Sequence, residues 1–344
     1  MRPSFFHHLH PPTIPAKQSR LRYTLGAGGL SVYLILVLGI SGALEMFYYI
    51  PTPLEAGKSI QVITFLVPYG NIVRNFHYWS AQFLVIISAL HLLRVIFTGS
   101  FAPPRRFNYL LGIGLFILIL FLNFTGYILR WDEGIRWALV AGTNLVKSIP
   151  IIGSSLYSFI VGGAKPGDAT LIRFYAWHIF GLALFLAVIG VWHLFRVRRD
   201  GGIAVPPPEF RKDNARISRF ELVRREGLAA LIATIVLLLV SAFFPAPLAP
   251  PMSDAGIVSA ESRAPWFFLW VQQLLSWGDA FWMGVFIPFA VLLFLTLIPF
   301  IFTKFHPEDL GTWFPSNQRP VQIIVAVLVV IILSLTFLAY RTSL

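Results

Sequence analysis

Four histidines in two apolar stretches have the residue type and spacing needed to hold metal ions inside a membrane. His77 and His91 are 14 residues apart, and His178 and His193 are 15 residues apart. At 100° and about 1.5 Å per helical residue, each pair returns to within roughly 40–60° of one face and rises about 21–22 Å. We therefore expect each helix to present two imidazoles on one face, one near each side of the membrane.

The two histidine-bearing stretches are the second and fourth of seven expected membrane spans. Their helices are therefore expected to cross the membrane in the same direction. His77 then shares a level with His178, and His91 shares a level with His193. Neutral imidazoles above and below a haem iron complete its six ligands, so the pattern predicts two haems, one at each level. A lone membrane histidine could instead form a hydrogen bond between helices, but four at matched spacing favour the haem interpretation.

Glycines and arginines at matching positions support this interpretation. Gly28 and Gly42 in the first span, like Gly112 and Gly126 in the third, are also 14 residues apart, and glycine lets a backbone approach a flat cofactor closely. Glycine pairs can also serve helix packing alone, and arginines can simply extend toward the interface. The arginines near the four histidines, which could neutralise haem propionates, are Arg74, Arg94, Arg173 and Arg196.

The composition is that of a membrane protein. Of 344 residues, 57% are hydrophobic and 12% are charged, whereas soluble domains carry about 25% charged residues. The chain has no cysteine, which excludes disulfides, iron–sulfur ligation by cysteine and thioether-attached haem. The 27 Lys and Arg against 15 Asp and Glu indicate membrane topology, and no nucleic-acid binding is expected.

Seven stretches are long and apolar enough to span a bilayer. They predict an all-α integral membrane protein whose first four helices form a di-haem four-helix bundle. Shorter apolar stretches at 137–146, 151–161 and 254–277 are expected to lie along the interface. The expected spans are 25–49, 77–97, 109–129, 174–195, 227–244, 281–302 and 321–340.

The distribution of positive charge predicts the orientation. The side that carries the N-terminus holds 18 Lys and Arg, Arg94 included, against 9 on the other side. The positive-inside rule therefore places the N-terminus in the cytoplasm and the C-terminus outside a bacterial cytoplasmic membrane. The expected organisation is a cytoplasmic segment (1–22), a four-span domain (23–204), a basic linker that opens with three prolines (205–226) and a three-span domain (227–344).

Several short segments carry a resemblance to a known family. They are 76–81 (FHYWSA), 91–94 (HLLR), 125–127 (TGY), 143–145 (TNL), 149–153 (IPIIG) and 173–178 (RFYAWH). From Tyr23 onward the chain resembles cytochrome b of the quinol-oxidising bc and b6f complexes. The histidine spacing and residues 47–52 (FYYIPT) are closer to the b6 branch, with its separate three-span subunit fused on here.

The resemblance implies a subunit of a homodimeric quinol:cytochrome c oxidoreductase, or of a complex with a similar acceptor. Quinol would be oxidised at the outer face, with one electron passing to a Rieske iron–sulfur protein and on to a c-type cytochrome. The other would cross through two non-covalent b-type haems to quinone near the cytoplasmic face, building a proton gradient. The b6 branch attaches a further haem through a cysteine where this chain has Leu34, so that haem is not expected.

One motif departs from the family pattern. Residues 264–267 (APWF) resemble the Pro-Glu-Trp-Tyr motif of the outer quinone site, with Trp266 kept and Phe267 in place of tyrosine. Pro265 replaces the glutamate that the resemblance implies as proton acceptor, and proline cannot accept a proton. Four acidic residues of the same side either substitute for it or only solvate loops: Glu261, Asp254, Asp132 and Glu133.

The inner side has its own candidate. Arg225 and Glu226 resemble a basic–acidic pair at the inner quinone site, where Glu226 either delivers protons or is a helix-start carboxylate favoured by the dipole. Arg130 and Gly181 stand where prolines are usual in the family. The histidines at positions 7, 8 and 10 are expected to form a solvated tail.

Two other functions stay open at this point. A di-haem membrane anchor of a quinone-linked dehydrogenase would use the same histidines but would not need the segments at 143–153 and 265–267. A haem-free transporter would use the histidines as a proton relay, which leaves the matching glycines and arginines without an explanation.

Overall fold

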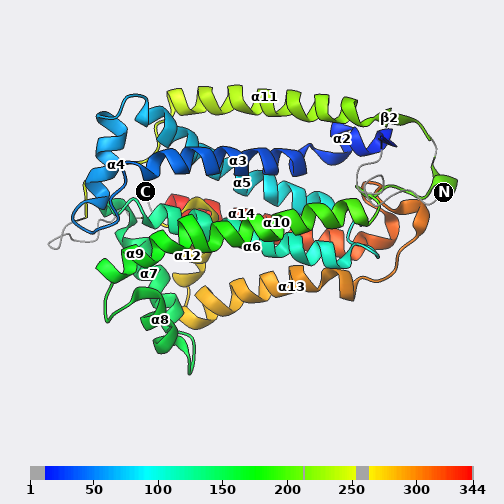
Figure 1. Ribbon diagram of the computed structural model, residues 1–344. Coiled ribbons are helices and arrows are strands. Elements are labelled where there is room, and N and C mark those ends of the chain that lie inside the picture. The colour runs from blue at the N-terminus through cyan, green and yellow to red at the C-terminus, as the bar shows by residue number, and fades with distance from the viewer. Residues whose placement is uncertain (1–11, 212–213, 253–262, 343–344) are drawn as a thin grey trace.

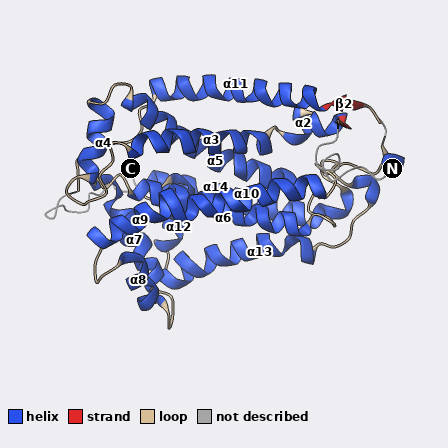
Figure 2. Cartoon of the chain, in the orientation of Figure 1, coloured by secondary structure: helices blue, strands red, loops and turns tan. Residues whose placement is uncertain are grey.

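The computed structural model describes residues 12–211, 214–252 and 263–342, and most of them are helical (Figure 2). Seven helices in these ranges are long and apolar enough to cross a membrane, as predicted. A helix pairs its backbone N–H and C=O groups internally, which a bilayer requires. The spans are α3 (Ala27–Met46), α5 (Gly70–Phe97), α6 (Arg106–Ile128), α9 and α10 (Asp168–Ala176 and Leu182–Arg199) joined by the π-helical turn Trp177–Gly181, α11 (Arg219–Phe243), α13 (Ile287–Ile301) preceded by the π-helical turn Trp282–Phe286, and α14 (Arg319–Thr342).

The spanning helices reach beyond the apolar stretches into the polar residues at their ends. α5 begins at Gly70, seven residues before His77. α11 begins at Arg219, because the Ser218 hydroxyl accepts a hydrogen bond from the Glu221 backbone N–H at 3.2 Å and so caps the helix. Residues 219–226 of the expected linker are therefore helical.

Four helices form the central bundle. α3 packs along α5, α5 along α6, and α6 along α10. The last three spans surround this bundle: α11 lies beside α3, α13 lies beside α6, and α14 contacts α5 and the short helix α12 (Leu269–Leu275) (Figure 1). A buried cluster in the middle of the bundle takes residues from α3, α5, α6, α10 and α11: Leu34, Leu84, Val85, Ile119, Leu186 and Leu237.

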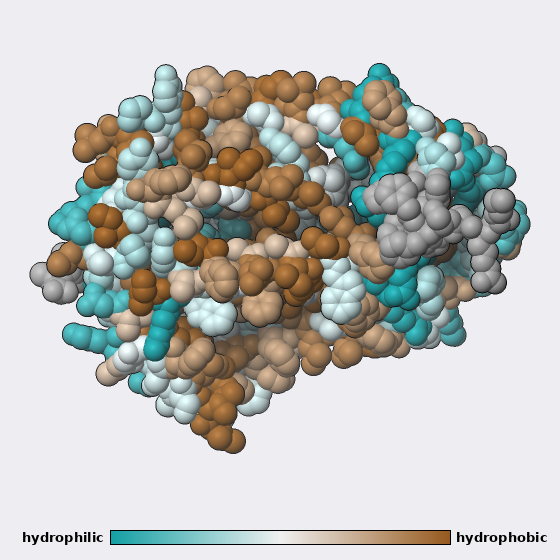
Figure 3. All heavy atoms as spheres, in the orientation of Figure 1, coloured by the Kyte–Doolittle hydropathy of each residue, from teal (hydrophilic) through white to brown (hydrophobic). Residues whose placement is uncertain are grey.

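Short elements gather at the two ends of the bundle (Figure 1). One end, here the His77 end, carries α4 (Ala56–Phe65), α7 (Arg136–Lys147), α8 (Gly153–Val161) and α9, and α7 and α8 confirm the short helices expected at 137–146 and 151–161. The opposite, His91 end carries α2 (Leu21–Thr24) and the two strands. Hydrophobic residues cover the middle of the visible face between more polar ends (Figure 3). The remaining single turns are Ala16–Ser19, Glu133–Ile135, Pro208–Phe210, Trp266–Phe268, Pro307–Asp309 and Ser316–Gln318.

A two-stranded sheet ties the N-terminal segment to the second half of the chain. β1 (Thr13–Pro15) pairs antiparallel with β2 (Arg216–Ser218), so that Ile14 lies opposite Ile217. Because β2 leads directly into α11, this pairing fixes the start of the fifth span at the His91 end.

Candidate functional site

His77 and His178 face each other at one level of the bundle. His77 lies on α5, and His178 lies in the π-helical turn between α9 and α10. Their ring centroids are 6.4 Å apart and the ring planes are inclined at 67°. Two metal–nitrogen bonds of about 2 Å, plus the two half-rings, give a separation of roughly 6 Å. The pair is therefore spaced to ligate one metal from opposite sides.

Hydroxyl groups orient both rings. The Ser41 Oγ lies 2.9 Å from His77 Nδ1, and the Thr125 Oγ1 lies 3.0 Å from His178 Nδ1. Each hydroxyl also donates to a carbonyl four residues earlier, to Val37 and Phe121, respectively. The hydroxyl oxygens are then free to accept from the Nδ1–H groups. This tautomer leaves both Nε2 atoms available as metal ligands.

His91 and His193 form the second level, toward the other end of the same helices. His193 Nδ1 lies 3.1 Å from the Asn108 backbone oxygen. A carbonyl oxygen can only accept, so His193 carries its proton on Nδ1 and again offers Nε2. The two imidazoles are near enough to interact electrostatically.

Each of the four predicted glycines lies against one of the histidines. A Cβ built on Gly42 would lie 3.0 Å from His77 Cε1, and one on Gly126 would lie 2.7 Å from His178 Cε1. At the other level, the corresponding distances are 3.4 Å for Gly28 to His91 and 3.5 Å for Gly112 to His193. The glycines therefore provide the space that the rings occupy, and the repeat of 14 residues places them at the histidine levels.

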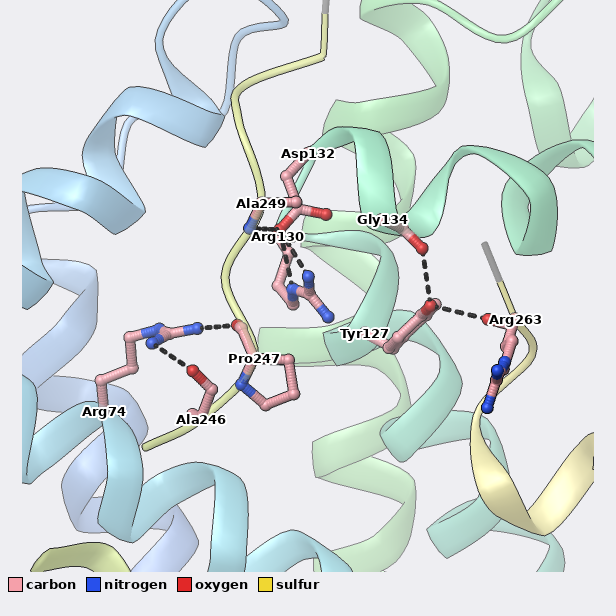
Figure 4. Close-up of polar contacts among 9 residues, drawn as sticks. All are labelled: Arg74, Tyr127, Arg130, Asp132, Gly134, Ala246, Pro247, Ala249 and Arg263. Carbon is pink, nitrogen blue, oxygen red and sulfur yellow. Dashed lines mark hydrogen bonds and ion pairs between the residues drawn. The ribbon is translucent and has the colours of Figure 1, made fainter. Parts of the chain in front are cut away.

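The four arginines each have protein partners. Arg74 donates to the backbone oxygens of Ala246, at 3.3 Å, and Pro247 (Figure 4). Arg173 donates to the oxygens of Ser158 and Phe159, at 3.2 and 2.6 Å. Arg74 thus joins the segment after α11 to α5, and Arg173 joins α8 to α9.

The other two arginines, Arg94 and Arg196, each have one donor nitrogen without an acceptor among the described residues. Arg94 donates from Nε to the Tyr23 backbone oxygen at 3.2 Å and lies over the Tyr23 ring, while Arg196 pairs with Asp200 at 3.2 Å. Arg94 Nη2 and Arg196 Nε are nevertheless buried without a hydrogen-bond partner among the described residues. Burial, followed by the charges of Arg94 and Arg20, lowers the pKa of Lys17 nearby.

These observations are the test of whether the residues fit a haem. The four imidazoles would hold the iron, three of them with their Nδ1 atoms engaged by the protein, and the glycines give the imidazole rings room beside α3 and α6. The unpartnered Arg94 Nη2 and Arg196 Nε at the His91 end would suit haem propionates, and Lys17 lies near Arg94. The residues therefore fit the group.

Two segments at the His77 end, α7 and residues 265–268, meet around Phe124. The Phe124 ring lies 5.9 Å from the Phe268 ring, and a Cβ on Gly142 would lie 2.9 Å from Phe124 Cζ. Trp266, beside Pro265 and Phe267, donates from Nε1 to the Gln82 side chain at 2.8 Å. Phe124 thus links α7 and residues 265–268 in one aromatic region at the His77 end.

Two of the four proposed substitute carboxyls are engaged in ion pairs. Asp132 is buried, pairs with Arg130 at 2.6 Å and accepts a hydrogen bond from Ala249 N at 3.2 Å (Figure 4). Glu133 pairs with Arg136 at 2.7 Å. The other two, Glu261 and Asp254, lie outside the described residues, as do the histidines at positions 7, 8 and 10.

Glu226 lies beside the His91 level. Its Oε1 would be 3.5 Å from a Cβ on Gly29, the neighbour of the glycine that contacts His91. Arg225 instead binds Glu221 at 2.8 Å and Ser19 at 3.0 Å. The structure therefore places Glu226, and not its basic neighbour, against α3.

Three partners of the histidines are absent from the sequence predictions: Ser41, Thr125 and the Asn108 carbonyl. The hydroxyl residues each precede a glycine that contacts the same histidine, so a Ser or Thr directly before the second glycine of each pair was the available signal. The backbone carbonyl of Asn108 leaves no signal in the sequence.

The chain is similar to known proteins over most of its length. A profile described as Cytochrome b(N-terminal)/b6/petB matches residues 82–251. Cytochrome b6 of Heliobacterium modesticaldum is 36% identical over 192 residues, which are 56% of this chain and 88% of that protein. Cytochrome b6 of Acaryochloris marina is 36% identical over 51% of this chain and 81% of that protein.

A solved chain from a "Hyperthermophilic respiratory Complex III" superposes with a TM-score of 0.77 at 23% identity, over 92% of this chain and 84% of that one. This likeness shows a shared fold that extends into the three-span half. The curated relatives, of which most of the length is matched, confirm the expected family. The chain is a multi-pass membrane protein of the cytochrome b/b6 family.

Proposed function

We propose that this chain is the di-haem cytochrome b subunit of a quinol:cytochrome c oxidoreductase, or of a complex with a similar acceptor. The observation that carries the proposal is the pairing of His77 with His178 and of His91 with His193 at two levels of one bundle. Haem iron bound at each level would accept and pass on single electrons. The complex would oxidise quinol at the His77 end, taken as outside, reduce quinone at the His91 end and build a proton gradient.

The chain's own residues have distinct tasks in this proposal. Ser41, Thr125 and the Asn108 carbonyl hold the Nδ1 protons of His77, His178 and His193, so that these three imidazoles would keep their Nε2 lone pairs for the metal. The apolar helices around them exclude water from the electron path. At the His91 end, Glu226 would hold a proton close to α3 for a quinone, as the resemblance implied for the inner site.

The quinol pocket at the His77 end would be formed by α7 and residues 265–268 around Phe124. Its aromatic lining suits the flat ring of a quinol, and Pro265 supplies no acid–base group. A Rieske iron–sulfur protein and a c-type cytochrome or equivalent would dock at this end, and the complex would be a homodimer in the bacterial cytoplasmic membrane.

A di-haem membrane anchor of a quinone-linked dehydrogenase is the second candidate. It is favoured by one observation, the proline in place of the acidic residue of the outer motif. The aromatic region that joins α7 to residues 265–268 argues against it, since an anchor has no need of that region.

An optical redox titration of the purified protein tests the haem assignment. Two low-spin haem signals with distinct midpoint potentials are expected, and a protein without haem would refute both candidates. Purification of the native complex then separates them. A co-purifying Rieske protein supports the quinol-oxidising complex, whereas a flavin or other dehydrogenase subunit in its place would support the anchor.

A further inference from the structure

Glu45 is an acidic residue inside a spanning helix. It lies in the last turn of α3, whose other residues are uncharged, and its Oε1 is buried without a hydrogen-bond partner. Acidic groups within membrane spans are costly to maintain and are candidates for function. Its presence in the first span therefore needs an explanation.

Its position on α3 links Glu45 to the His77 level. Ser41 and Gly42, which contact His77, precede it by four and three residues. Residues three and four apart lie on the same face of a helix, so the Glu45 carboxyl lies one turn farther toward the His77 end on the face that contacts the histidine.

The charged groups around Glu45 come from the neighbouring helix α5 and the loop beyond α6. Arg74, which precedes His77 by three residues, is the cation that acts on the Glu45 carboxyl. Arg74 is in turn influenced by Arg130, Asp132 and Tyr78. Its hydrogen bonds go to the backbone oxygens of residues 246 and 247, so the guanidinium is held near Glu45 without forming an ion pair with it.

Two other carboxyls at this end form ion pairs. The buried Asp132 pairs with Arg130, and the partly buried Glu133 pairs with Arg136. Glu45 forms no ion pair with any described residue. Burial and the negative end of the α3 dipole oppose a charged carboxylate, while Arg74 favours one. Because these influences on Glu45 oppose one another, a further charge nearby can decide whether its carboxyl holds a proton.

We propose that Glu45 binds and releases a proton in step with the redox state of the site held by His77 and His178. Uptake of one electron there adds one negative charge, and the Glu45 carboxylate takes one proton from the aqueous phase at the His77 end. Loss of that electron returns the proton to the same phase. This inference rests on the proposed function, because it requires a haem at that level.

The test is the pH dependence of the two haem midpoint potentials in wild type, Glu45→Gln, Glu45→Asp and Glu55→Gln. Glu55 is the matched control, because it lies at the same end in an exposed ion pair with Lys58. In wild type, the potential of the His77/His178 haem is expected to fall with rising pH, by up to about 59 mV per pH unit. Glu45→Gln should flatten this slope and leave the other haem unchanged. Glu45→Asp should retain the slope at a displaced pH, and Glu55→Gln should match wild type.

Two results overturn the inference and leave the proposed function intact. One is a pH dependence of the His77/His178 haem potential that persists in Glu45→Gln, and the other is a potential that does not change with pH in wild type although both haems are present. Absence of haem from wild type refutes the proposed function itself. A second measurement applies if Glu45→Gln does not assemble. The infrared difference spectrum of wild type should show a protonated carboxyl band on reduction, which Glu45→Asp should shift, and its absence from wild type would contradict the proposal.

Discussion

Alanine at position 126 tests the link between the glycine repeat and the paired histidines. The added Cβ would lie 2.7 Å from His178 Cε1 and 3.3 Å from Nε2. Carbon atoms pack at about 3.5–4.0 Å, so the imidazole must move by roughly 1 Å or α6 must separate from α10. A movement of that size would stretch the 3.0 Å contact between His178 Nδ1 and Thr125 beyond hydrogen-bond range.

Gly126→Ala should lower the free energy of unfolding only slightly, but it should strongly disturb the haem site at the His77 level. Overpacking costs about 1–3 kcal/mol, and replacing glycine by alanine within a helix returns about 0.5–1 kcal/mol. The protein should therefore still fold in Gly126→Ala. Metal ligation tolerates displacement poorly, so the haem at the His77 level should be lost or strongly shifted while the other haem remains.

Gly114→Ala is the matched control, because Gly114 lies on the same helix and a Cβ there would meet no atom within 4 Å. Haem content per chain and an optical redox titration, measured on both variants and wild type in one detergent, provide the assay. We expect about half the haem in Gly126→Ala and the full amount in Gly114→Ala. Two haems at unchanged potentials in Gly126→Ala would refute the role given to this glycine.

Three further outcomes follow from the same contacts. His193→Ala should remove the haem at the His91 level and keep the other, and an optical spectrum with both haems retained would reject the ligand assignment. Thr125→Val should weaken haem retention at the His77 level by roughly 10–100-fold, while Thr125→Ser should preserve it; equal haem-transfer rates to apomyoglobin in the two variants would exclude the hydrogen bond as the cause. Asp132→Asn should destabilise the protein by up to about 3–5 kcal/mol, because it removes the buried carboxylate that neutralises the partly buried Arg130. Thermal unfolding should show partial recovery when Arg130→Gln is added, and unfolding as in wild type in the single variant would contradict the buried pair.

Helical periodicity explains why the spans and the four histidines could be predicted from sequence. The rise and rotation per residue are properties of the backbone, so residues 14 or 15 apart return to one face whatever surrounds them. The same reasoning found Gly42 and Gly126, since their repeat matches that of the histidines. The structure adds the identity of each pair, Gly42 with His77 and Gly126 with His178.

The partners of long polar side chains depend on tertiary packing, which periodicity does not encode. Arg74 was expected beside haem propionates, and it binds backbone oxygens of residues 246 and 247, more than 170 positions away in the chain. The sequence predictions do not include Glu45, because their acidic candidates at the His77 end all lie between the spans. A single acid in an otherwise apolar span was the available signal.

Two departures from the family pattern, at positions 130 and 265, both bear on the role of Asp132. Arg130 stands where a proline is usual, and it pairs with Asp132, a residue considered as a substitute for the glutamate absent at position 265. Asp132 also accepts a hydrogen bond from Ala249, so the pair attaches the segment after α11 to the end of α6. Asp132 thus holds two segments together through its contacts with Arg130 and the Ala249 N–H. The arginine that makes this loop unusual therefore gives Asp132 a structural role, and a quinol in the pocket proposed around Phe124 would have to pass its protons to another group.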